Sequence, residues 1–285
     1  MLIVCPTPIG NLGDVTQRQR EALAEADIIA CEDTRRAGKL LEALGVDRST
    51  GRPKLWRYDD HTARKQTPAL VEAVRRGQQV VLTTDAGTPT ISDPGYRLVR
   101  ACREQGLEVT SLPGAVAATV ALSASGLATD RFVFDGFLPT KATGRRERLE
   151  ELERLEATVV LYESPRRIVE TLEAVEEVFG AQQLLCVGRE LTKRHEEYLW
   201  GEVSEVRSQL SQRESIRGEL TVCIEGREAA SGEEDGRWEE ADRVIAAMVE
   251  QQVSRRTIKE VVDQVFDLPR SQIYGRIDRI SAGGE

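Results

Sequence analysis

The sequence has few of the side chains that metal sites and secreted proteins depend on. Only two of its 285 residues are histidine, and its five cysteines are scattered singly without a C-x-x-C pair. Closely spaced cysteine and histidine ligands are the usual signature of a zinc site, so we expect no metal. Single cysteines in apolar runs are typical of a reducing compartment, so we expect a cytoplasmic protein with buried thiols.

Long apolar runs are missing as well. The chain begins MLIVCPTPIG, where a short apolar run has no basic flank, so we expect no signal peptide. No later run approaches the length that spans a bilayer, and we expect no membrane partner. The formal net charge of −9 argues against coating nucleic acid by bulk electrostatics, but it is compatible with a local basic patch.

Common nucleotide-binding and hydrolase motifs are also absent. The sequence contains no G-x-x-x-x-G-K-[S/T], G-x-S-x-G or H-E-x-x-H. The first loop, PTPIGNLGD (6–14), sits where a dinucleotide-binding fold places G-x-G-x-x-G. Its residues Pro6 and Pro8 have no amide hydrogen to donate to a pyrophosphate. A ligand without phosphates therefore fits this loop better than NAD, FAD or a nucleoside triphosphate.

Apolar strands and helices alternate over the first part of the chain. We expect strands at 2–5, 27–31, 54–58, 80–82 and 108–112. Helices are expected between them, one of them starting at Thr67 and Pro68. This alternation predicts a mostly parallel sheet covered by helices on both faces, in a first α/β domain at residues 1–130.

The pattern changes from Phe132, where an aromatic strand is followed by a basic loop at 140–148. Short connections between the later strands suit a mixed sheet with hairpins, so we expect a second α/β domain at 131–227. A flexible linker at 228–237 and a small helical unit at 238–281 are expected to follow. Two helices of that unit resemble a helix-turn-helix, but a plain helical cap shows the same pattern.

The stretch VLTTDAGTPTISDPG (81–95) is the strongest candidate for a ligand loop. It follows a buried strand and combines two prolines, two glycines and several polar side chains. In open α/β sheets, ligands bind outside the carboxyl ends of the strands. An ordinary surface loop has the same composition, so the other motifs must decide between the two.

Three charged clusters follow other strands. CEDTR (31–35) places two carboxylates and a guanidinium at a strand end, where Asp33 or Thr34 can equally cap the next helix. YESPRR (162–167) repeats the combination of acid and arginine. RELTKRHEE (189–197) is a charge run of the kind that usually forms a solvated surface, but its position directly after a strand also suits the edge of a site.

Eight segments occur here in one order: PTPIGNLGD, ACEDTR, TDAGTPTISDPG, LPGAVAATVALSASGL, DGFLP, YESPRR, RELTK and GEL-x-V-x-IEG. In them the chain resembles the bacterial 16S ribosomal RNA 2′-O-ribose methyltransferases that modify cytidine 1402 of the small subunit. That family belongs to the tetrapyrrole-methylase-like class of S-adenosylmethionine enzymes. The resemblance runs from residue 1 to about Gly226, and TDAGTP-x-ISDPG together with CEDTR is its most specific part.

The resemblance implies a two-domain, tetrapyrrole-methylase-like α/β fold that binds S-adenosylmethionine in the cleft between its domains, as a homodimer. The cofactor-binding residues that it implies are Ile9, Gly10, Asp85, Ala86, Gly87, Thr88, Pro113, Gly114, Val116, Ala117, Tyr162 and Leu191. Short glycine and proline loops offer backbone hydrogen bonds and an apolar slot, which suit an adenosyl group. Within the 81–95 loop, Ser92–Gly95 is then expected to brace the turn into the next helix.

The implied reaction is an in-line displacement in which a ribose 2′-oxygen takes the methyl group of a sulfonium, without a metal. Positioning supplies much of the acceleration, and a nearby carboxylate can accept the hydroxyl proton. The unranked candidates for this catalytic role are Asp33, Asp85, Glu163 and Glu190. The candidates for contacts to RNA phosphates are Arg35, Lys141, Arg145, Arg146, Arg166, Arg167, Lys193 and Arg194.

Two other functions stay open at this point. The same fold can methylate a tetrapyrrole or a protein residue, and a non-enzymatic ribosome-assembly factor can retain a ligand pocket. CEDTR, YESPRR and the basic tail favour RNA. The expected partner is therefore 16S ribosomal RNA or the assembled small ribosomal subunit.

Overall fold

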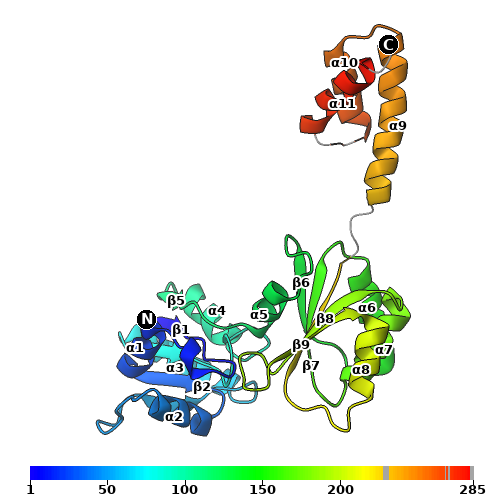
Figure 1. Cartoon of the computed structure of the whole chain (residues 1–285). Helices are drawn as coiled ribbons and strands as arrows, with labels where there is room; N and C mark the ends of the chain where they lie inside the picture. The colour runs from blue at the N-terminus through cyan, green and yellow to red at the C-terminus, as the bar shows by residue number, and fades with distance from the viewer. Residues whose placement is uncertain (227–230, 267, 269, 283–285) are drawn as a thin grey trace. The chain divides into compact units, whose positions relative to one another are not determined.

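The chain forms two compact units, Met1–Gly226 and Arg227–Glu285, in a computed structural model that describes residues 1–226, 231–266, 268 and 270–282. The first unit holds two five-stranded sheets, each with its own helices (Figure 1). We call the first sheet with its helices the first lobe, and the second sheet with its helices the second lobe.

The first sheet is entirely parallel, in the order β3-β2-β4-β1-β5. Its strands are β1 (Leu2–Val4), β2 (Ile28–Cys31), β3 (Lys54–Arg57), β4 (Val80–Leu82) and β5 (Val109–Ser111). The three central strands are buried along their whole length, because both faces of the sheet are covered. The predicted parallel sheet is confirmed.

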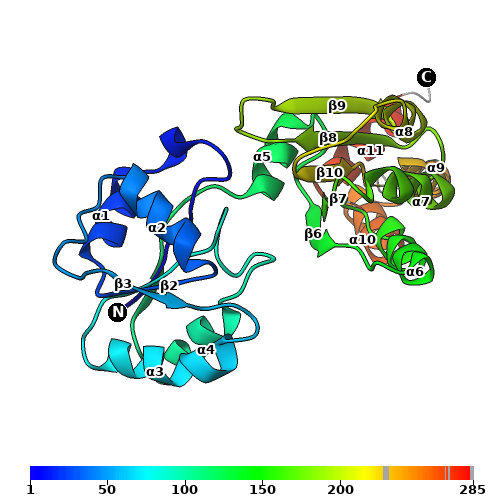
Figure 2. The same ribbon diagram turned by 90° about the horizontal axis from the view of Figure 1, so that it is seen from below.

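Two helices cover each face of this sheet (Figure 2). On one face lie α1 (Gln17–Glu25) and α2 (Thr34–Ala43), preceded by the short 3-10 helix η1 (Leu12–Asp14). On the other lie α3 (Ala63–Arg75) and α4 (Tyr96–Glu104). The helix start expected at Thr67 is wrong. The Asp59 carboxylate accepts a hydrogen bond from the Thr62 amide at 2.7 Å, and this turn starts the helix earlier and leaves Pro68 inside it.

The second sheet is mixed, in the order β6-β7-β10-β8-β9, as predicted. Its strands are β6 (Phe132–Phe137), β7 (Thr158–Glu163), β8 (Leu184–Arg189), β9 (Glu197–Glu202) and β10 (Leu220–Ile224). Only β6 and β7 pair in parallel; the other neighbours are antiparallel. The apolar core on one face is built with α6 (Ala142–Glu153), α7 (Ile168–Phe179) and α8 (Val203–Ser211).

Two features of the second lobe differ from the expectation. The basic segment 140–148, expected as a loop, is largely the first part of α6. The helix α5 (Ala117–Ala124), expected with the first domain, packs on the other face of the second sheet through small side chains such as Ala118 and Ala121. Because α5 follows the first sheet and covers the second, it links the two lobes.

The described residues of the second unit form three helices, α9 (Ser231–Glu250), α10 (Arg255–Phe266) and α11 (Arg270–Ala282). Its own apolar core includes Trp238, Ile258 and Ile273. The linker expected at 228–237 is wrong from Ser231 onward, where the chain is helical, while 228–230 lie outside the described residues.

Candidate functional site

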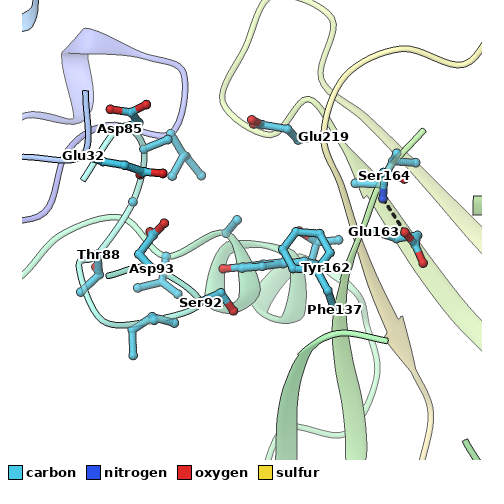
Figure 3. A pocket seen from close by; sticks show the side chains of 18 of the residues that line it. Glu32, Asp85, Thr88, Ser92, Asp93, Phe137, Tyr162, Glu163, Ser164 and Glu219 are labelled. Carbon is cyan, nitrogen blue, oxygen red and sulfur yellow. Dashed lines mark hydrogen bonds between the residues drawn. The ribbon is translucent and has the colours of Figure 1, made fainter. Parts of the chain in front are cut away.

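Both lobes of the Met1–Gly226 unit line one cavity of about 390 Å³. The first lobe contributes segments that follow β1, β2, β4 and β5, at the carboxyl ends of parallel strands. The second lobe contributes the ends of β6 and β7 and the start of β10 (Figure 3). Open α/β sheets bind ligands outside these strand ends, so this cavity is the candidate site.

Three loops of the first lobe are tied together at the cavity. Thr7 and Gly87 exchange two backbone hydrogen bonds, with N···O distances of 2.8 and 3.1 Å. The Thr88 hydroxyl donates to the Ala115 carbonyl oxygen at 3.0 Å. Gly87 has a φ of +90°, and a Cβ there would lie 3.5 Å from Ile9 Cγ2. The structure thus brings together the three loops expected to meet the cofactor.

Most of the residues expected to bind the cofactor are in the cavity wall. Those that line it are Ile9, Asp85, Ala86, Gly87, Thr88, Val116, Ala117 and Tyr162. Those that do not are Gly10, Pro113, Gly114 and Leu191. A Cβ on Gly10 would lie 2.3 Å from Lys193 Cγ, and one on Gly114 would lie 2.3 Å from Pro6 Cβ. These two glycines therefore let the loops approach their neighbours, while Leu191 is buried in the core beneath α5.

Tyr162 gives the cavity an aromatic wall. Its hydroxyl accepts a hydrogen bond from the Ala118 amide at 3.3 Å, which ties β7 to α5. Its ring packs edge-on against Phe134 and Phe137. Burial raises the pKa of Tyr162, so the phenol is neutral at pH 7. The side chain is fixed at both ends and presents a rigid surface.

Two of the four candidate proton acceptors line the cavity, and each is paired with a cation. An Asp85 carboxylate oxygen is 3.2 Å from Arg36 Nη1. Glu163 is 3 % exposed; one of its oxygens accepts from the Thr171 hydroxyl at 2.6 Å and lies 3.2 Å from Arg167 Nη2. These contacts hold both carboxylates in place and engage oxygens that would otherwise accept a proton.

The other two candidates, Asp33 and Glu190, are outside the cavity wall. Asp33 is the N-cap of α2, and its hydrogen bond with the Arg35 side chain lowers its pKa to about 2. Glu190 lies 2.7 Å from Lys193 Nζ, and this contact lowers the pKa of the Glu190 carboxyl. The helix-capping interpretation of CEDTR is therefore confirmed for Asp33, and its catalytic role stays a prediction.

The cavity wall also contains charged and aromatic residues outside the expected site. They are Glu32, Arg36, Asp93, Phe137 and Glu219. Glu32 and Arg36 could have been named from the sequence, because Glu32 lies within CEDTR and Arg36 directly follows it. Asp93 is the most distinctive: burial, followed by the nearby negative charges of Glu32, Asp85 and Asp60, raises its pKa to about 6.

The residues expected to contact RNA differ in exposure. Arg35, Lys141, Arg146, Arg166 and Arg194 are exposed. Lys193 pairs with Glu190 and Glu219, and Arg167 pairs with Glu163. The expectation for Arg145 is contradicted: it lies on α6 and is 7 % exposed, because α6 turns this side chain inward rather than into a basic loop. Arg145 is therefore unavailable to a phosphate.

Other chemistry is limited in the described part of the chain. Within it, no group of three or more histidine, cysteine, aspartate or glutamate side chains is arranged to hold a metal ion. None of its helices has the length and apolar character to cross a membrane. All five cysteines are buried and free, as expected.

The fold and the site correspond to a known class. The family of Tetrapyrrole (Corrin/Porphyrin) Methylases matches residues 1–207. The methyltransferase CobJ has a similar structure, with a TM-score of 0.58 and 20 % identity, covering 79 % of this chain and 94 % of that chain. A uroporphyrin-III C-methyltransferase from Thermus thermophilus, complexed with S-adenosylhomocysteine, has a TM-score of 0.54 and 18 % identity. The match covers 79 % of this chain and 97 % of that chain. The protein is therefore a methyltransferase of the tetrapyrrole methylase class, which uses S-adenosylmethionine.

Curated relatives narrow the class further. Ribosomal RNA small subunit methyltransferase I of Escherichia coli O157:H7 is 43 % identical over 229 residues, covering 80 % of this chain and 78 % of that protein. The Synechocystis sp. protein of the same name is 39 % identical over 288 residues, covering 100 % of this chain and 99 % of that protein. The chain belongs to the ribosomal RNA small subunit methyltransferase I family.

Proposed function

We propose that this protein methylates the ribose 2′-oxygen of cytidine 1402 in 16S ribosomal RNA, in the cavity between its two lobes. The observation that carries the proposal is the meeting of three backbone loops of the first lobe with the strand ends of the second. The 39–43 % identity to ribosomal RNA methyltransferases supports RNA as the substrate. Identity to the methyltransferase CobJ is only 20 %.

The cavity suits an adenosyl group better than a phosphate-bearing nucleotide. Ile9, Val116 and Ala117 give it an apolar wall. Gly87 leaves room for a ligand to approach, since a Cβ there would meet only Ile9 Cγ2 and the Ala115 carbonyl oxygen within 4 Å, apart from its chain neighbours. Pro6 and the loop that follows it offer no run of amides for a pyrophosphate. In our proposal, the cofactor is held by these residues together with Asp85–Thr88 and Tyr162.

The charge of the cavity suits the methyl donor. When bound, S-adenosylmethionine supplies an electrophilic methyl group on a positively charged sulfur. Five carboxylates line the cavity, those of Glu32, Asp85, Asp93, Glu163 and Glu219, beside the single guanidinium of Arg36. This negative field stabilises a cation, and the paired Asp85 and Arg36 hold the loop after β4 against α2.

Exposed cations are proposed to contact the RNA backbone. Lys141, Arg166 and Arg194 are exposed on the second lobe, and Arg35 is exposed at the start of α2. Such side chains position an RNA strand through its phosphates without reading its bases. They provide the local basic surface that a chain with a net charge of −9 needs.

We also propose that the protein is a homodimer and acts in the cytoplasm. The edge strand β9 carries Trp200, which is 56 % exposed. An open sheet edge with a large exposed apolar side chain is a surface that a second copy can cover. The buried free thiols of the five cysteines suit a reducing compartment.

The test is transfer of label from methyl-labelled S-adenosylmethionine to three acceptors: small ribosomal subunits lacking the modification, naked 16S ribosomal RNA, and uroporphyrinogen. We expect label on the RNA, at one nucleotide whose 3′ bond resists alkaline cleavage because its 2′-oxygen is methylated. Nuclease digestion and mass spectrometry locate that nucleotide. The first two acceptors show whether an assembled subunit is required.

Two results would contradict the proposal. Label on the tetrapyrrole alone would show that the substrate is not RNA. Cofactor binding without transfer to any acceptor would favour a ribosome-assembly factor.

A further inference from the structure

Asp93 occupies an unusual place in the cavity wall. It lies in the loop after β4, in the half expected only to brace the next helix, yet it lines the cavity (Figure 3). Its negative charge contributes to the raised pKa of Tyr162, which lines the same cavity. Asp93 is partly buried as well as part of the cavity wall.

The other carboxylates of the cavity have stabilising partners. Asp85 pairs with Arg36, Glu163 with Arg167, and Glu219 with Lys193. Glu32 accepts a hydrogen bond from the Thr84 hydroxyl at 3.2 Å. Within residues 1–226, no arginine or lysine forms an ion pair with Asp93; the Thr84 hydroxyl, which donates to Glu32, is the polar group that opposes the rise of the Asp93 pKa. In this part of the chain, Asp93 and Glu32 are thus the cavity carboxylates without an ion-pair partner, and burial raises the pKa of Asp93.

The backbone around Asp93 is strained in a way that fixes its position. Thr90 and Ser92 have φ values of +77° and +60°, although neither is glycine. A β-branched residue in this region is a genuine outlier, and such strain is kept mainly where it positions functional groups. The loop is held from both lobes: a Cβ on Gly95 would lie 2.7 Å from Leu82 Cδ2, and one on Gly136 of β6 would lie 3.0 Å from Ser92 Oγ.

We propose that Asp93 is the base that accepts the proton of the ribose 2′-hydroxyl, an inference that rests on the function proposed above. The ribose oxygen forms a bond to the methyl carbon while the carbon–sulfur bond breaks and its electron pair stays on sulfur. The hydroxyl proton passes to a carboxylate oxygen of Asp93 and then to water. Charge and atoms balance without a further reactant.

The electrostatic surroundings make Asp93 a suitable base near neutral pH. Burial, followed by the charges of Glu32, Asp85 and Asp60, raises its pKa from 3.8 to about 6, and the Thr84 hydroxyl opposes this. The group is therefore ionised at pH 7 but holds a transferred proton far better than an ordinary carboxylate. The other titratable group facing it is Tyr162, which is neutral at that pH.

The experiment compares Asp93→Asn with the matched control Asp60→Asn, using full-length protein and small ribosomal subunits. Asp60 is exposed, carries the same charge near Asp93 and does not line the cavity. We expect Asp93→Asn to lower kcat by about 10²–10⁴-fold while cofactor affinity measured by calorimetry falls by far less. Asp60→Asn should keep the wild-type rate at pH 8.

The pH dependence separates a base from a residue that only supports the loop. For the wild type, kcat/KM should fall below about pH 6 as Asp93 becomes protonated. Asp60→Asn should move this acid limb to lower pH, since it removes a charge that raises the pKa of Asp93. Asp93→Glu should keep the limb at a reduced rate, and the residual activity of Asp93→Asn should lose it.

The inference would be overturned by an Asp93→Asn rate within about threefold of wild type, or by an acid limb that persists in that variant. If Asp93→Asn does not fold, a wild-type profile without the limb overturns it equally. Failure of the proposed function is distinguishable, because it appears as absence of methylation by the wild type itself.

Discussion

At the scale of single residues, Asp85 and Asp93 share one loop but have opposite surroundings. Asp85 faces Arg36 at 3.2 Å and accepts a hydrogen bond from the Asp33 amide. For Asp93, the Thr84 hydroxyl opposes the effect of several negative neighbours on its pKa. One carboxylate is therefore suited to hold a loop and a ligand in place, and the other is suited to exchange a proton.

This difference leads to a prediction for Asp85. Asp85→Ala removes the contacts that hold the loop to α2 and a carboxylate from the cavity wall, so binding of S-adenosylmethionine should be abolished or fall by about 100-fold or more. Calorimetry measures the affinity. Asp14→Ala, which changes an exposed aspartate of η1 outside the cavity, should bind normally. Normal cofactor binding by Asp85→Ala would place the cofactor elsewhere.

Part of this difference between Asp85 and Asp93 can be predicted from the sequence. Asp85 could be singled out because TDAGTP follows a buried strand, and the strand end is where ligands bind. Asp93 could not be singled out as a base from the sequence, because its raised pKa depends on burial and on the charges of Glu32 and Asp60. Those two residues come from other loops. Arg145 fails for the same reason: its charge predicts exposure, and only the packing of α6 shows that it is buried.

At the scale of elements, the loop after β4 depends on the backbone freedom of Gly95. Its φ is +142°, and a Cβ would lie 2.7 Å from Leu82 Cδ2 and 2.9 Å from Thr90 Cγ2. Gly95→Ala must therefore adopt a strained backbone and displace either the core strand or the loop itself.

We expect Gly95→Ala to lower the free energy of unfolding by about 2–4 kcal/mol, which urea denaturation measures. Gly106→Ala is the control, because Gly106 also has positive φ, +67°, but a Cβ there meets nothing within 4 Å. Gly106→Ala should lower the free energy of unfolding by about 1–2 kcal/mol, from the strained backbone alone. An equal loss of unfolding free energy in the two variants would show that the loop after β4 accommodates the added Cβ of Gly95→Ala without further strain.

Most elements follow from apolar periodicity and capping residues, as the capping box of Thr16 and Gln19 at α1 shows. The expectations that fail involve competing signals. Thr67 and Pro68 resemble a helix start, but the turn at Asp59 starts α3 earlier. The glycine-containing segment 231–237 resembles a linker, yet it forms the first turns of α9. For α3, the hydrogen bond that starts the helix joins Asp59 and Thr62, outside the Thr67–Pro68 pattern, so that pattern alone cannot locate the start.

At the scale of the whole molecule, the cavity is built entirely from the Met1–Gly226 unit. The apolar cores of that unit draw on residues 1–226 alone, and Trp238 and Ile258 belong to the separate core of the helical unit. Cofactor binding should therefore be independent of α9, α10 and α11. These helices can instead contribute to RNA binding.

A chain shortened to residues 1–226 tests this separation. It should unfold cooperatively and bind S-adenosylmethionine with an affinity within about threefold of the full chain, because every residue of the cavity wall is retained. Calorimetry of the two chains gives this comparison. The KM for small ribosomal subunits then decides between the two interpretations of the helical unit: an RNA-binding helix-turn-helix raises KM when removed, and a plain cap leaves it unchanged. Loss of cofactor binding would mean that the helical unit completes the site.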